Sequence, residues 1–104
     1  MEKLMNDKYT PNPFLTTLGL ARRAGKLILG WDRISEYSGH ISFCITSNDA
    51  AERTVLNAQK RAETIHVDHS MEVLGSALGV KKVAVVAVTD DGFAELLKKK
   101  MKNN

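Results

Sequence analysis

A run of six apolar residues late in the sequence constrains the fold more than any other feature. It is Val83–Val88, VAVVAV, and four of its six side chains are β-branched valines. Such composition is typical of a strand that is covered on both faces, which requires helices above and below its sheet. We therefore predict a central strand at Val83–Val88 in an α/β fold, a three-layer α/β/α sandwich.

Helical and extended patterns alternate along the rest of the chain. We expect helices at residues 13–24, 32–37, 49–62, 70–78 and 90–102. We expect the remaining strands at residues 26–29, 41–46 and 64–68. This order predicts a four-stranded mixed sheet in a single domain at residues 13–104, after a loose N-terminal arm at residues 1–12.

Capping residues mark the expected helix boundaries. Two residues suit helix N-cap positions: Asn12, which precedes Pro13, and Ser70. Gly25 and Gly79 can take the left-handed conformation that closes a helix. Four more boundaries are expected at a cap on Asp32, a capping box of Asp49 and Glu52, a stop at Gly39, and a cap on Asp90 or Asp91.

Composition excludes several classes of protein. With 43% hydrophobic and 26% charged residues, the chain is expected to fold alone rather than to be disordered. The opening MEKLMNDKYT lacks the apolar run of a signal peptide, and no run is long enough to span a membrane, so we expect a cytoplasmic protein with no membrane partner. Cys44 is the one cysteine and lies in an apolar run, which favours a buried thiol.

Positive charge gathers toward both ends of the sequence, and the net charge is +3. Residues 1–40 hold six basic and four acidic residues, residues 41–80 three and five, and residues 81–104 six and three. This distribution fits a surface that meets phosphates. It fits equally well an ordinary protein with a solvated, lysine-rich tail.

Several blocks in a fixed order resemble one known family. Residues 14–36 combine a helix ending in RRAGK, a short strand, and a glycine turn that opens a second helix. The VLGSALG of Val73–Gly79 and the VAVVAVTDDGF of Val83–Phe93 follow, with a weaker DAAERT at Asp49–Thr54. Together they resemble the kink-turn RNA-binding ribosomal protein superfamily, of the L-seven-Ae and L-thirty-e type, and most closely its small bacterial branch. The resemblance also implies an α/β/α sandwich.

The resemblance implies an RNA-binding site in two segments. In that family the turn after the first strand and the start of the second helix enter the widened groove of a kink-turn, and the loop after the fourth helix touches a flipped-out nucleotide. By position, the implied RNA-binding residues are Lys26, Gly30, Trp31, Asp32, Arg33, Glu36, Val80, Lys81 and Lys82. Arg22 and Arg23 would join Lys26 as phosphate contacts, with helix capping as the alternative role.

Three positions depart from the pattern of the archaeal members. Asp32 stands in place of Asn, Arg33 in place of Glu, and Glu36 in place of Lys. Arg33 can still donate two parallel hydrogen bonds to guanine N7 and O6, with Glu36 holding it from one turn on. The alternative is an ordinary surface Arg–Glu pair. Trp31 likewise has two possible roles. A base of the RNA could stack on its ring, or the ring could pack over Tyr37 or the first helix.

The sequence gives little support to catalysis. His40, His66 and His69 are scattered and have no base or ligand at a recognisable spacing. His66 and Asp68 lie two apart on an expected strand and could hold a metal ion, although a solvated pair is the default reading. We therefore expect no enzyme activity, no cofactor and no metal.

These observations favour a non-catalytic, ribosome-associated RNA-binding protein that recognises structured, kink-turn-like RNA. The expected partners are ribosomal RNA or a messenger leader, and ribosomal particles, bound by a monomer. The alternative is a protein-interaction adaptor that keeps the fold and has lost kink-turn specificity.

Overall fold

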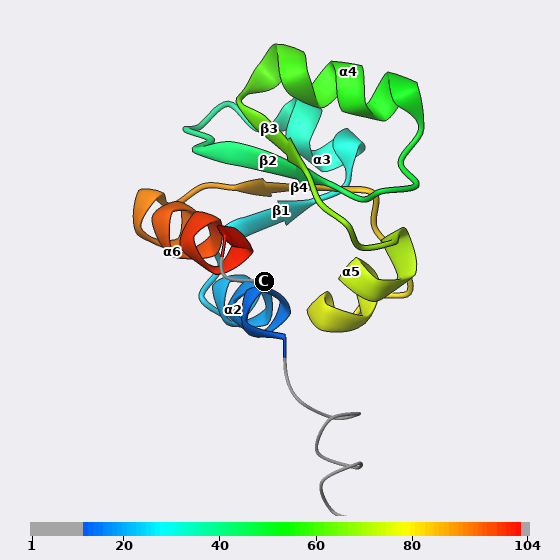
Figure 1. The fold of residues 1–104 in the computed structure, drawn as a ribbon. Helices are drawn as coiled ribbons and strands as arrows, with labels where there is room; N and C mark the ends of the chain where they lie inside the picture. Colours follow the sequence, from blue (N-terminus) through cyan, green and yellow to red (C-terminus); the bar gives the residue numbers. More distant parts are fainter. Residues whose placement is uncertain (1–11, 103–104) are drawn as a thin grey trace, which may run out of the picture.

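A computed structural model describes residues 12–102 of the chain (Figure 1). The arm predicted at residues 1–12 lies outside this range, apart from Asn12. Within residues 12–102, five helices and four strands alternate in the predicted order. They are α2 (Pro13–Arg23), β1 (Leu27–Leu29), α3 (Trp31–Glu36), β2 (Phe43–Thr46), α4 (Glu52–Arg61), β3 (Thr64–His66), α5 (Met71–Leu78), β4 (Val85–Val88) and α6 (Asp91–Lys102).

The four strands form one mixed sheet in the order β1-β4-β2-β3. Strand β4 runs antiparallel to both β1 and β2, with Leu27 opposite Val88 and Thr46 opposite Val85. Strands β2 and β3 are parallel. All four residues of β4 are buried, so the prediction of an inner strand covered on both faces is confirmed.

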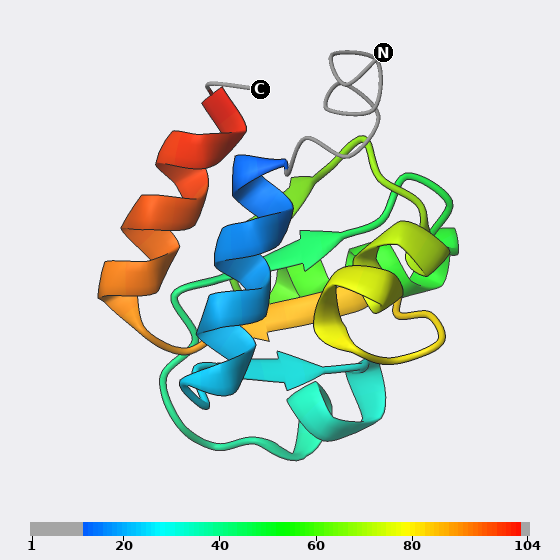
Figure 2. The same ribbon diagram turned by 90° about the horizontal axis from the view of Figure 1, so that it is seen from below.

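Alternate side chains of β4 enter the two layers beside the sheet. Val86 and Val88 belong to the larger core cluster, which lies under α2, α5 and α6. Val85 and Ala87 belong to a smaller cluster with Ile34 of α3 and Ala58 of α4. Figures 1 and 2 show the same division, with α3 and α4 on one face and α2 between α5 and α6 on the other. The α/β/α sandwich is therefore confirmed.

Local chemistry at several helix ends is as predicted. The Asn12 side chain accepts hydrogen bonds from the backbone N–H groups of Phe14 and Leu15, at 2.9 and 3.2 Å. Ser70 accepts one from the Val73 N–H at 3.1 Å. Gly79 closes α5 in the left-handed conformation, with φ of 76°.

Three other predicted boundaries were wrong. Helix α3 begins at Trp31 with Gly30 as its N-cap, so Asp32 lies within the first turn and caps nothing. Helix α3 ends at Glu36, before the predicted stop at Gly39. The capping box also fails, because Ala51 is the N-cap of α4 and makes no side-chain cap.

Two further side chains have clear structural roles. Asp90 caps α6 by accepting a hydrogen bond from the Phe93 N–H at 2.9 Å. Cys44 is a free thiol in the core, as predicted, and burial raises its pKa. Among residues 12–102, the helices are too short and too polar for any of them to cross a bilayer.

Candidate functional site

A glycine turn joins β1 to α3. Gly30 has φ of 90°, a conformation that side-chain-bearing residues rarely adopt. Its N–H donates to the Val85 carbonyl of the neighbouring strand at 2.9 Å, and its carbonyl accepts from the Ile34 N–H at 3.1 Å. The glycine turn is therefore fixed to the sheet, and the first helical turn of α3 extends from it toward solvent.

Helix α3 presents three charged residues to solvent, Asp32, Arg33 and Glu36. Arg33 and Glu36 do not pair, because the ion pairs in the described part of the chain are His40–Asp91 and Lys98–Glu63. Glu36 therefore does not hold Arg33 in position, and the two residues do not form an ordinary surface ion pair either. The Arg33 guanidinium is open to a ligand. Trp31 is half-buried and packs against the smaller core cluster.

The loop after α5 is held close to its own helix by Gly75. A Cβ atom at Gly75 would lie 2.6 Å from the Lys82 Cα, so only glycine allows this approach. The Val80 N–H donates to the Gly75 carbonyl at 2.9 Å. Val80 is half-buried, whereas Lys81 and Lys82 are exposed. The VLGSALG block thus shapes the loop that carries the two lysines.

The sheet topology brings these two segments together. Because β1 and β4 are antiparallel, the residues after β1 and those before β4 lie at the same end of the sheet. We call this end, formed by Gly30–Arg33 and Val80–Lys82, the turn end. Within residues 12–102 the side chains of Arg33, Lys81 and Lys82 form no hydrogen bond or ion pair.

The loop after β2 also reaches the turn end, and the sequence interpretation did not include it in the site. The Ser47 N–H donates to the Ala84 carbonyl at 2.9 Å, and Asp49 accepts from the Met71 N–H at 2.9 Å. The Ser47 side chain and the Met71 N–H hold the pKa of Asp49 below its ordinary value, and the charge of Lys82 adds to this effect. The DAAERT block was the available signal for this loop.

Three basic residues predicted to converge beside the turn have separate positions. The Arg22 guanidinium donates to the Leu78 carbonyl and so caps α5 rather than its own helix. Arg23 lines a groove between α2 and α5. Lys26 lies at the far end of β1 from Gly30, roughly 13 Å away at the usual rise of a strand.

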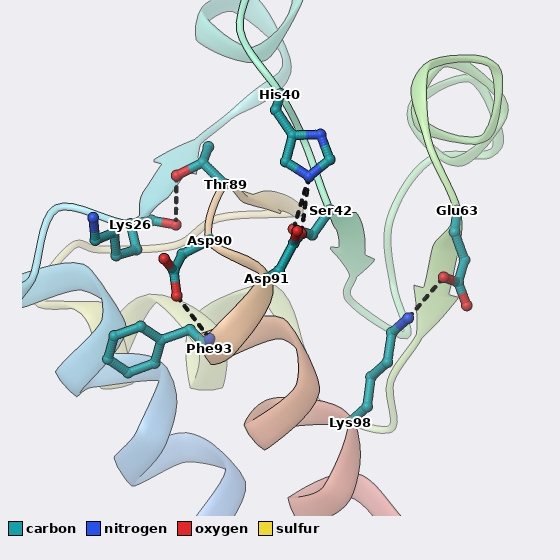
Figure 3. A network of polar contacts seen from close by, with 9 residues as sticks. All are labelled: Lys26, His40, Ser42, Glu63, Thr89, Asp90, Asp91, Phe93 and Lys98. Carbon is teal, nitrogen blue, oxygen red and sulfur yellow. Dashed lines mark hydrogen bonds and ion pairs between the residues drawn. The ribbon is translucent and has the colours of Figure 1, made fainter.

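Polar side chains at the opposite end of the sheet bind one another (Figure 3). His40 Nε2 lies 2.9 Å from Asp91 Oδ1, which also accepts from the Ser42 hydroxyl. Lys98 Nζ lies 2.7 Å from Glu63 Oε1. The Ser42 hydroxyl first, and His40 second, lower the pKa of Asp91. We call this end, with His40, Ser42, Glu63, Asp91 and Lys98, the paired end.

The backbone of Lys26 belongs to the paired end. Its carbonyl accepts from both the N–H and the hydroxyl of Thr89, at 2.9 and 3.1 Å (Figure 3). Its side chain is therefore separated from the turn end by the whole length of β1.

His66, Asp68 and His69 line one pocket of about 280 Å³, but among residues 12–102 each of them contacts a different partner. His66 Nδ1 lies 3.0 Å from the Thr46 hydroxyl, whereas Asp68 accepts from the Asn48 amide at 3.3 Å. His69 stacks on Phe14, with 5.8 Å between ring centroids. Within residues 12–102 there is no group of three or more His, Cys, Asp or Glu side chains placed to hold a metal ion. The His66–Asp68 pair is therefore divided between two structural contacts.

Comparison with known proteins found similar chains, although no family model matches. The chain is 33% identical over 86 residues to the RNA-binding protein YlxQ of Bacillus subtilis, covering 77% of this chain and 86% of that protein. A solved structure of a protein of unknown function from Bacillus halodurans has a TM-score of 0.75 and 26% identity, over 88% of this chain and 99% of that one. A Giardia lamblia 15.5kD RNA binding protein has a TM-score of 0.62 and 14% identity, over 88% and 83% of the two chains, and supports the fold alone.

Proposed function

The chain belongs to the L-seven-Ae-like family of RNA-binding proteins, and from that premise we propose that it binds structured RNA through the turn end, without catalysis. The observation that supports the proposal is a set of exposed cations there that form no ion pair within residues 12–102. Arg33, Lys81 and Lys82 extend from two segments that the sheet holds side by side. Basic groups that are not neutralised within the protein are available to phosphates and base edges.

The two segments are suited to different parts of an RNA. Arg33 lies on a helix whose start is fixed by Gly30, and its planar guanidinium can donate to guanine N7 and O6. Lys81 and Lys82 lie on a loop whose backbone is pressed against Gly75, so their ammonium groups serve as phosphate contacts of defined position. In this proposal Arg33 recognises a base of the RNA, and Lys81 and Lys82 fix the orientation of the protein on the RNA backbone.

The ligand we propose is a kinked duplex in ribosomal RNA or a messenger leader, bound in the cytoplasm, in part on ribosomal particles. A kinked duplex opens its groove, and this gives a short helix such as α3 access to base edges that a regular A-form duplex hides. Lys26, about 13 Å along β1, would be a flanking phosphate contact.

Binding of the Arg33→Ala variant to a kinked duplex and to an unkinked duplex of equal length tests this function. We expect a loss of about 1–3 kcal/mol on the kinked RNA, the value of a bidentate base contact, and a much smaller loss on the other. The matched control is Lys60→Ala, which removes an exposed cation of α4. Equal losses on both RNAs would exclude base reading. Absence of binding to any folded RNA by the wild type would instead favour the adaptor.

A further inference from the structure

A groove runs between α2 and α5 on the outer surface of the larger helical layer. It has a cavity volume of about 400 Å³. Figures 1 and 2 show the two helices side by side. Its apolar walls include Leu15, Leu20 and Val73, and Ala77 lies beside its floor. The turn end does not use this surface.

The groove exposes large apolar side chains in one place. Leu20 is 48% exposed and Val73 is 40% exposed, and they stand on facing helices. Gly19 allows the two helices to approach closely, because a Cβ there would lie 3.1 Å from the Ala77 carbonyl oxygen. A concave apolar surface between two rigid helices differs from isolated exposed leucines, which are normal on any protein.

One end of the groove is cationic, and no acidic side chain of residues 12–102 forms an ion pair with it. Helix α2 contains Arg22 and Arg23 and no acidic residue, and the one acid of α5, Glu72, lies in its first turn, away from the arginines. Arg22 is engaged with the Leu78 carbonyl, but Arg23 lines the groove and forms no ion pair within residues 12–102. An acidic group on a bound partner would therefore complement the charge of Arg23.

We infer that the α2–α5 groove is a docking site for an amphipathic helix of a partner protein, with two or three apolar anchors and an acidic residue that pairs with Arg23. The groove spans about 12 Å from Leu15 to Arg23 at 1.5 Å per helical residue, a little over two turns. That length matches anchors at positions i, i+4 and i+7 of a partner helix.

Site-specific photocrosslinking in the native cell tests this inference. A benzophenone amino acid replaces Thr16, an exposed residue on the rim of the groove, and the control replaces Gln59 on α4. We expect ribonuclease-resistant crosslinks from position 16 to one protein, whose crosslinked peptide is an amphipathic helix with an acidic residue. Crosslinks at position 59 should be at least fivefold weaker.

Matched variants make the result specific to the groove. Leu20→Ser and Arg23→Glu should each lower the yield at position 16 at least fivefold, while Leu56→Ser, which removes a 49% exposed leucine from α4, should leave it unchanged. RNA affinity of the Leu20→Ser variant serves as the check on folding and should equal that of wild type. The inference is overturned by crosslinks to RNA, to a second copy of this chain or to no protein above the control level, or by equal yields in the leucine variants.

Discussion

The two ends of the sheet carry similar kinds of side chain but use them differently. At the paired end Asp91 binds both His40 and Ser42, and Lys98 binds Glu63 while its Nζ lies 4.9 Å from the centre of the Phe43 ring. At the turn end the cations make no such contacts in the described part of the chain. The charged side chains of the paired end therefore hold loops in place, whereas those of the turn end are available to a ligand.

The energetics support this division. Exposed ion pairs are weak because water screens them, so the paired end gains little stability by joining the loop before β2 and the start of β3 to α6. At the turn end, the acidic Asp49 binds a backbone N–H rather than Lys81 or Lys82. The charge of Lys82 still acts on Asp49, because it helps to lower the pKa of that carboxylate, whereas Lys81 forms no ion pair within residues 12–102.

The largest expected effect comes from Gly75→Ala, which tests whether the turn end depends on one close backbone contact. The added Cβ would lie 2.6 Å from the Lys82 Cα, and backbone cannot rotate away as a side chain can. We expect a loss of about 2–3 kcal/mol in the free energy of unfolding, in the upper range for overpacking. Urea denaturation followed by circular dichroism measures it.

Gly92→Ala is the control at the paired end. The new Cβ would lie 3.2 Å from Asp90 Oδ2, so this side chain must move by a few tenths of an ångström while it keeps its hydrogen bond to the Phe93 N–H. We expect a change within about 0.5 kcal/mol. Similar losses in the two variants would show that the loop before β4 has no special need for glycine.

A smaller effect is expected on RNA affinity when the lysines of the turn end are removed singly. If Lys81 and Lys82 each neutralise one phosphate, each alanine variant should reduce the slope of log affinity against log salt by roughly 0.7–0.9. Lys98→Ala removes a cation from the paired end and should leave the slope unchanged, because that lysine already has Glu63 as its partner. Filter binding from 50 to 300 mM salt, roughly the range in which such slopes are resolved, makes the measurement. If Lys98→Ala changed the slope of log affinity against log salt as much as Lys81→Ala, this would contradict the proposal that the turn end binds RNA and the paired end does not.

The smallest effect concerns acid stability at the paired end. The hydroxyl of Ser42 and the imidazole of His40 lower the pKa of Asp91 from its ordinary 3.8. A lowered pKa in the folded state means that the stabilisation is complete above 3.8 and is lost as the pH falls through the lower value. Asp91→Asn should therefore be less stable than wild type at neutral pH, and the difference should shrink in acid.

Urea denaturation of both proteins at several pH values from neutral to about pH 2, below the ordinary range for carboxyls, measures this change. Asp32→Asn is the control at the turn end, because the Asp32 side chain forms no hydrogen bond within residues 12–102. A stability difference for Asp91→Asn that is constant with pH would refute the proposed role of that carboxylate.

Features that depend on a few neighbouring residues could be predicted from the sequence. The valine-rich run identified the inner strand, and the Asn12 and Ser70 caps and the left-handed Gly79 were read from residues within one turn of each. The glycine turn at Gly30 was also identified, because glycine between a strand and a helix has few other uses.

The errors arise where a polar side chain binds far along the chain. Asp49 was expected to cap the helix that follows it, yet it binds the Met71 N–H, 22 residues away. Arg22 binds a carbonyl 56 residues away, and His40 binds a carboxylate 51 residues away. Lys26 was placed beside the turn because it is near Gly30 in sequence, but an extended strand carries it to the other end of the sheet. Local patterns contain no information about these pairings.

The placement of β4 between β1 and β2 has a consequence for biosynthesis. The N-terminal strand of the sheet has no hydrogen-bonding neighbour until the last strand has been translated, so a nascent chain holds an unpaired hydrophobic edge for most of its synthesis. Native pairing must close a loop of nearly sixty residues, between Leu29 and Val86, and such long-range closure slows folding. Ribosomes that stall before β4 would therefore release a fragment open to aggregation, and the two halves of the proposed RNA surface would first meet after β4 has been translated.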